Sequence, residues 1–113
     1  MKRQLGQLRP ADTTAASLFS PSTAQSYEAA TLFIANTTGT AAAASVFHDI
    51  NGTTYDETTA LLFGKSVAAN DYIVLEVPFG DRLVAGNIAV KSGTGSALTF
   101  TLYGGCWGEV VKL

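Results

Sequence analysis

Alternation of apolar and polar side chains is the strongest pattern in this chain, and it is clearest towards the C-terminus. Between residues 96 and 103, Leu98, Phe100 and Leu102 fall on one side of an extended chain, and small or hydroxylated residues fall on the other. Successive side chains of a strand point to opposite faces, so this period of two predicts a strand with one buried face. Glycine pairs on both sides mark its ends.

Two other segments have the composition expected of partners in the same core. In residues 72–77, Ile73, Leu75 and Val77 share one face. In residues 27–36 both faces are largely apolar, which predicts a strand that is central in its sheet or covered at an interface.

The rest of the chain contains short apolar segments separated by turn residues. The alanine run at 41–44 has helical propensity, but the residues around it favour a strand. Gly64 is expected to end a short strand over residues 60–63, and Gly86 permits a bulge in a strand over residues 82–91. Strands recurring about 8–12 residues apart are typical of sandwiches and jelly rolls. The sequence therefore predicts an all-β, antiparallel β-sandwich, jelly-roll-like, with seven to eight strands.

Composition narrows the class of protein without naming an activity. The chain has 113 residues, enough for one domain with its own core. Only 14% of the residues are charged, against about a quarter in a typical domain. This indicates either a surface that is partly hidden in an assembly or an inert β domain.

Charge and cysteine content argue against several classes of partner. The net charge is −2, and Lys2, Arg3 and Arg9 place much of the positive charge at the N-terminus, so we expect no nucleic-acid partner. No apolar run approaches the roughly 18 residues of a membrane span, and no apolar segment follows the basic N-terminus as in a secretory signal. Cys106 is the only cysteine, which excludes an internal disulfide. Cytoplasmic synthesis is consistent with these features.

The two ends of the chain are the candidate interface. Residues 1–16 show no sustained period and are expected to form an extended arm, with the sandwich domain and an apolar C-terminal tail over residues 17–113. Leu5, Leu8 and Arg9 would hold the arm on a neighbouring subunit, and Trp107 would anchor the tail. We therefore expect deletion of the arm to leave the domain folded and to weaken oligomerisation.

No catalytic, cofactor-binding or metal-ligating residues are predicted. His48-Asp49 has no second partner fixed by the sequence, so a structural or solvated histidine is the preferred interpretation. Four oxygen-donor residues lie near one another: Asp49, Asn51, Asp56 and Glu57. Their order does not match a calcium-binding loop, and turn formation explains them better. Cys106 has no basic neighbour in the sequence that would lower its pKa. We expect a protein that is not an enzyme and uses no cofactor.

Several segments are similar to a known group of proteins: residues 33–41 (FIANTTGTA), 45–56 (SVFHDINGTTYD), 59–63 (TALLF), 68–71 (AAND) and 80–83 (GDRL). Over about residues 17–104 the chain resembles small β-sandwich structural virion proteins of tailed bacteriophages, of the capsid decoration, neck or tail accessory type. The resemblance implies a non-enzymatic virion protein that forms a symmetric homo-oligomer on other virion structural proteins. It supplies no functional residues to carry over.

Two other functions remain open from the sequence. A carbohydrate- or receptor-binding β-sandwich module of a phage fibre or spike would be favoured by exposed aromatic residues gathered in loops, for which Tyr55 is the one candidate. A small hydrolase is the weaker alternative, because no catalytic constellation is recognisable.

Overall fold

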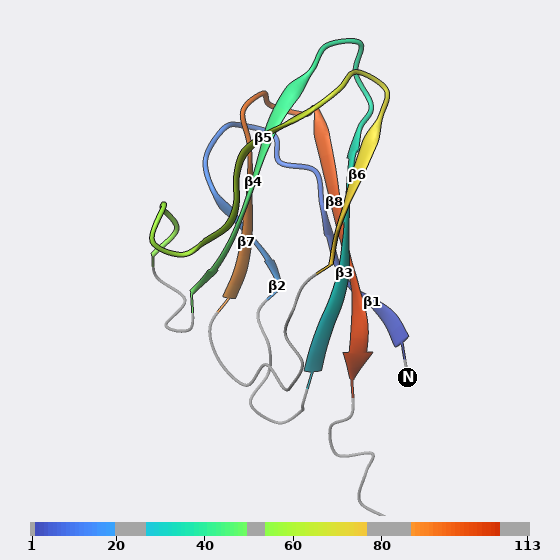
Figure 1. Ribbon diagram of the computed structural model, residues 1–113, viewed down its shortest axis with the longest axis vertical. Helices are drawn as coiled ribbons and strands as arrows, with labels where there is room; N and C mark the ends of the chain where they lie inside the picture. Colours follow the sequence, from blue (N-terminus) through green and yellow to red (C-terminus); the bar gives the residue numbers. More distant parts are fainter. Residues whose placement is uncertain (1, 20–26, 50–53, 77–86, 107–113) are drawn as a thin grey trace, which may run out of the picture.

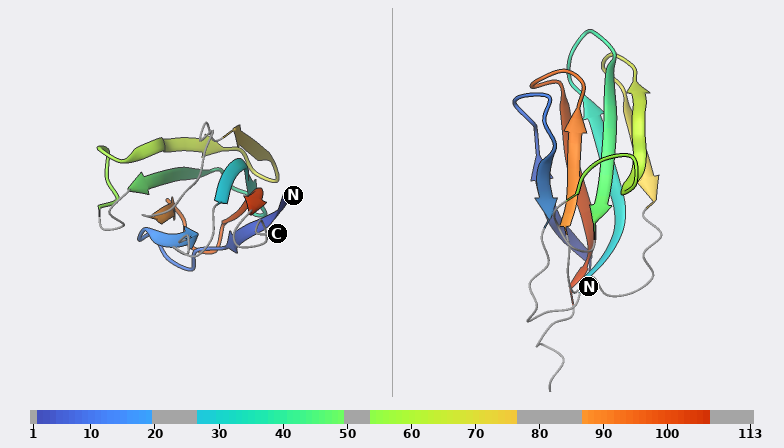
Figure 2. Two further views of the ribbon diagram at one scale, coloured as in Figure 1. Left: turned by 90° about the horizontal axis from the view of Figure 1, so that it is seen from below. Right: turned by 90° about the vertical axis from the view of Figure 1, so that its left-hand side faces the viewer.

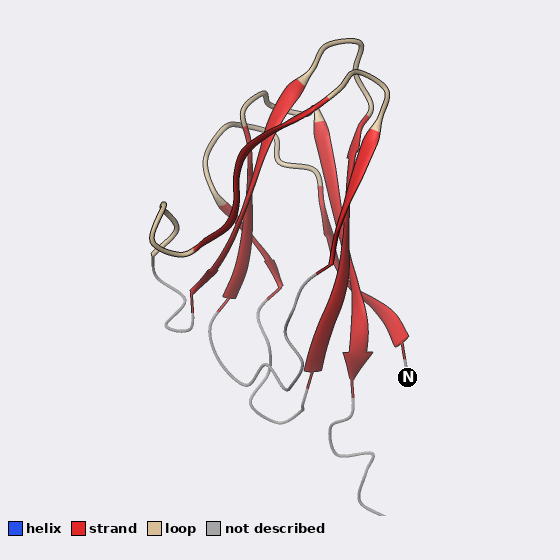
Figure 3. Ribbon diagram, in the orientation of Figure 1, coloured by secondary structure: helices blue, strands red, loops and turns tan. Residues whose placement is uncertain are grey.

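The computed structural model describes residues 2–19, 27–49, 54–76 and 87–106 (Figure 1). Within these ranges every regular element is a strand (Figure 3). The strands are β1 (Lys2–Leu8), β2 (Ala16–Phe19), β3 (Tyr27–Asn36), β4 (Ala42–Asp49), β5 (Ala60–Val67), β6 (Tyr72–Glu76), β7 (Asn87–Ser92) and β8 (Leu98–Cys106). Residues 42–44 of the alanine run lie in β4, as their context predicts.

The strands form two antiparallel sheets that pack face to face (Figures 1 and 2). Sheet A has the order β1-β8-β3-β6, and sheet B has the order β2-β7-β4-β5. Strand β1 pairs with β8, β2 with β7, β3 with β6 and β4 with β5, as in one long hairpin that has been rolled up. The pairs β3–β8 and β4–β7 complete the two sheets. This is the arrangement of a jelly roll, so the predicted all-β sandwich is confirmed.

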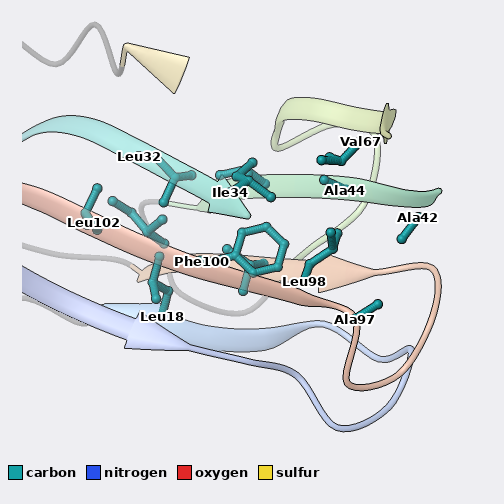
Figure 4. Packing of buried hydrophobic residues seen from close by; sticks show 13 residues of the cluster. Leu18, Leu32, Ile34, Ala42, Ala44, Val67, Ala97, Leu98, Phe100 and Leu102 are labelled. Atoms are coloured by element: carbon teal, nitrogen blue, oxygen red, sulfur yellow. The ribbon is translucent and has the colours of Figure 1, made fainter. Parts of the chain in front are cut away.

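The core lies between the two sheets, and the alternation in the sequence predicts its members. Leu98, Phe100 and Leu102 are fully buried from β8, and Leu32 and Ile34 are fully buried from the neighbouring β3 (Figure 4). Sheet B contributes a second set of buried apolar side chains: Leu18, Ala42, Ala44, Val46, Val67, Ile88 and Val90. Ala42 and Ala44 supply part of this set.

The N-terminal segment differs from the arm that the sequence suggests. Lys2–Leu8 forms β1 and pairs with β8 of its own sheet. A register shift between Gln4 and Gly6 marks a bulge, which breaks the alternation by which a strand is recognised in a sequence. A Cβ atom at Gly6 would collide with the carbonyl oxygen of Leu18 in β2. Glycine at this position allows β1 and β2 to approach closely, so the segment belongs to the sandwich.

Strand β5 runs further than the sequence predicts. Gly64 does not end it: the residue has a φ of +68° inside β5, where glycine is tolerated without steric cost. The register of β5 against β4 shifts twice, once at Phe63 and Gly64 and again at Leu61. The strand passes through these bulges and continues to Val67. Hydrogen bonds to β4 beyond the bulge outweigh the local break.

Asn36 joins three segments at one end of the sandwich. Its side-chain amide donates to the carbonyl oxygens of Thr40 and Val67, at 2.9 and 3.0 Å. Its Oδ1 accepts the Thr38 N–H at 2.9 Å. Asn36 is only 2% exposed, and a buried amide needs these partners. The residue thus ties the β3–β4 turn to the end of β5.

Candidate interaction surface

The outer face of sheet A carries a group of aromatic side chains that the antiparallel register brings together. Phe33 in β3 lies beside Val74 of β6 on one side and beside Thr101 of β8 on the other. In the neighbouring strands, Tyr72 lies beside Ala35 and Tyr103 lies beside Thr31, two residues from Phe33 in either direction along β3. Since Leu32 and Ile34 point inward, these side chains point outward.

The aromatic rings contact one another and remain accessible. The Phe33 and Tyr72 rings are nearly parallel, with centroids 6.1 Å apart. The Tyr103 ring meets Phe33 edge-on at 6.0 Å. Exposure is 40% for Phe33, 58% for Tyr72, 42% for Val74 and 39% for Tyr103. We refer to Phe33, Tyr72, Val74 and Tyr103 as the aromatic patch.

The aromatic patch has very little charge around it. The structure describes nine outward side chains on β3, β6 and β8 between the pair Thr31–Glu76 and the pair Ala35–Tyr72. Among them, Glu76 is the one acidic or basic residue (Asp, Glu, Lys, Arg or His). Its Oε1 accepts a long hydrogen bond of 3.4 Å from the Thr31 hydroxyl. The remaining positions are threonine and alanine. Aromatic enrichment with few charges is the composition of an interface core.

On sheet B an outward-pointing aromatic side chain is covered by the chain itself. Phe47 points outward from β4 yet is only 1% exposed, because the rings of Tyr55 and Phe63 lie against it with centroids 6.3 Å away. The loop that carries Tyr55 is held by hydrogen bonds, among them the Thr54 N–H donating to Asp49 Oδ2 at 2.6 Å. Tyr55, the loop aromatic that the sequence offers for ligand binding, therefore packs against Phe47 in this structure.

The predicted interface residues lie in different surroundings. Leu5 and Leu8 are partly buried and pack against the core of their own domain. Arg9 is exposed, and its guanidinium donates to the Ser96 carbonyl oxygen from Nε at 3.1 Å and from Nη2 at 2.6 Å. Trp107 falls outside the described residues. The structure places none of the first three at the aromatic patch.

The candidate chemical residues are engaged in local structure. Burial lowers the pKa of His48, while the adjacent Asp49 carboxylate acts in the opposite direction. Asp56 accepts the Thr58 hydroxyl at 2.6 Å and the Thr58 N–H at 2.9 Å, and these bonds lower its pKa. Across the described ranges, no group of three or more histidine, cysteine or acidic side chains is placed to hold a metal ion. Asn51 lies outside those ranges.

The aromatic patch was not among the predicted site residues, although its signal is present in the sequence. Residues 27–36 are apolar on both faces, and one apolar face is enough for the core. The second apolar face, which carries Phe33, therefore indicates a surface that is covered at an interface. Tyr72 and Val74 likewise occupy the outward face of their strand. Only the register shows that these residues form one patch.

Comparison with protein-family models, with curated proteins and with solved structures finds no match for this chain. In the part of the chain that the structure describes, no helix has the length and hydropathy of a membrane span.

Proposed function

We propose that this protein is a non-enzymatic structural protein of a tailed-phage virion, which assembles as a symmetric oligomer on the capsid, neck or tail. The observation that carries the proposal is the aromatic patch: a weakly charged, aromatic surface on a rigid sheet, exposed in the isolated chain. Such a surface loses its contact with water in an assembly, and burying apolar area stabilises the assembly by about 25 cal/mol per Å². The segments that resemble phage virion proteins supply the setting.

A test of this function starts from the purified chain. Native mass spectrometry and light scattering at micromolar concentrations should give one discrete oligomer. Phe33→Glu places a charge at the centre of the aromatic patch and should dissociate the oligomer or abolish its binding to co-expressed virion proteins. Leu61→Glu is the matched control, because Leu61 is exposed to a similar extent but lies on sheet B. A wild-type chain that stays monomeric and binds no virion protein would refute the proposal.

A second candidate function has one observation in its favour. The most exposed ring of the aromatic patch is that of Tyr72, which offers an apolar face and a phenolic hydroxyl, a combination suited to carbohydrate. Glycan-array binding that is lost in Tyr72→Ala, with the oligomeric state unchanged, would favour a carbohydrate-binding module of a fibre or spike. The accessible rings lie on strands, however, and the loop aromatic Tyr55 is packed on Phe47.

A further inference from the structure

The four edges of the sandwich are not equivalent. The edge strands are β1 and β6 in sheet A, and β2 and β5 in sheet B. Strands β1, β2 and β5 each shift register against their neighbour, a bulging that protects edges from pairing with other chains. The pairing of β6 with β3 is regular throughout, and β6 contains no lysine, arginine, proline or glycine. Among the described edges, β6 is the one left open to another strand.

The backbone of β6 is directed so that alternate residues are available for pairing. The Asn36 N–H donates to the Asp71 carbonyl oxygen at 2.8 Å. Hydrogen-bonded pairs recur at every second residue of an antiparallel ladder, so Tyr72, Val74 and Glu76 direct their N–H and C=O groups away from β3. The Tyr72 N–H is already taken by Asp71 Oδ1 at 2.8 Å. Val74, at the centre, presents both groups at the open edge.

We propose that β6 pairs antiparallel with β6 of a second copy of this chain, about a two-fold axis beside Val74. Sheet A would then continue from one subunit into the next. This inference rests on the proposed function in taking a second copy as the occupant. In this register Val74 lies opposite Val74 of the partner subunit, and each donates a hydrogen bond to the other. Tyr72 lies opposite Glu76, and Ile73 lies opposite Leu75.

The strand complements itself in this register. Glu76 meets a tyrosine and not a second carboxylate, so no like charges lie directly opposite each other. Ile73 and Leu75, which are only partly buried in the single chain, gain an apolar neighbour on the inner face. A two-fold axis normal to the sheet keeps both aromatic patches on the same side, where they form one continuous surface. Self-complementarity of this kind is what a two-fold interface requires.

Cysteine cross-linking tests the register directly. In the full chain carrying Cys106→Ser, Val74→Cys should form a disulfide-linked dimer on mild oxidation, because opposed Cα atoms about 5.5 Å apart are within disulfide range. Tyr72→Cys alone should not cross-link, whereas Tyr72→Cys combined with Glu76→Cys should. Cross-linking of Tyr72→Cys in preference to Val74→Cys, or of none of these variants, would overturn the proposed register.

Proline substitution separates this inference from the proposed function. Val74→Pro removes the outward N–H without touching the ladder to β3, and Val74→Thr keeps both the N–H and the branched shape. We expect the dimer dissociation constant of the proline variant to exceed that of the threonine variant about tenfold, with unchanged circular dichroism. A second result is that the wild-type chain is oligomeric and that the proline and threonine variants form oligomers of the same mass. That result would overturn the β6 pairing and leave the proposed function standing. A monomeric wild type would remove both.

Discussion

Truncation of Phe100 is the most informative perturbation of the fold. Phe100 is fully buried in β8, where it lies beside Leu8 of β1 and Ile34 of β3. Phe100→Ala removes a buried ring, and the lost free energy of transfer from water to the core is about 2 kcal/mol. The space left behind, about 100 Å³, adds about 2 kcal/mol at 24 cal/mol per Å³. We therefore expect the free energy of unfolding to fall by about 3–5 kcal/mol.

Urea denaturation followed by circular dichroism measures this loss, with all variants at one protein concentration because assembly also stabilises the fold. Leu61→Ala is the control: Leu61 is exposed on β5, so its truncation should cost about 1 kcal/mol or less. If Phe100→Ala does not fold, Phe100→Leu should still fold, with a smaller loss of about 1–2 kcal/mol. A cost for Phe100→Ala no larger than that of the control would show that the strand faces have been assigned in reverse.

Four further outcomes follow from the structure. Asn36→Ala should lower the free energy of unfolding by about 2–3 kcal/mol in urea melts, because it leaves two carbonyl oxygens without their amide donor; a loss under about 0.5 kcal/mol would contradict the network. Gly64→Ala should cost about 1 kcal/mol, from its φ of +68° alone, since a Cβ there meets open space; a neutral change would mean that the backbone relaxes. Burial lowers the pKa of His48 below its ordinary 6.5, so the contribution of neutral His48 to stability is complete above pH 6.5 and is lost as the pH falls. Between pH 7 and pH 5 the wild-type protein should therefore lose more stability than His48→Gln. Both proteins should assemble normally and contain no metal. Deletion of residues 1–16, which the sequence alone predicts to be harmless to the fold, should instead lower the melting temperature, because it removes β1 and leaves β8 paired only with β3. An unchanged melting temperature would favour the extended arm that the sequence predicts.

Local chemistry was sufficient to predict the all-β class and much of the core. Apolar residues at every second position all lie on one face of a strand, and this face is the one that becomes buried. Leu98, Phe100, Leu102, Ile73 and Leu75 therefore turn inward in the structure as their spacing predicts.

Tertiary structure decided the elements whose local signal is broken. Strand β1 carries a bulge and is held by the edge of β8, which lies far away in the sequence, so no pattern within residues 1–16 reveals it. Gly64 suggests an end to β5, but pairing with β4 beyond the bulge carries the strand onward. In both cases the long-range hydrogen bonds to the neighbouring strand outweigh the local preference, because forming them stabilises the segment by more than the bulge destabilises it.

The candidate surface shows the same division. The sequence shows that Phe33, Tyr72 and Tyr103 alternate with core residues, and hence that each points outward. Which outward residues become neighbours depends on register and strand order, which bring β3, β6 and β8 side by side. The openness of the β6 edge is also a tertiary property, because it depends on β6 having β3 as its one neighbour among the described strands of the sheet. A single sequence encodes the faces of its strands, whereas only the folded sheet determines which faces and edges remain for a partner.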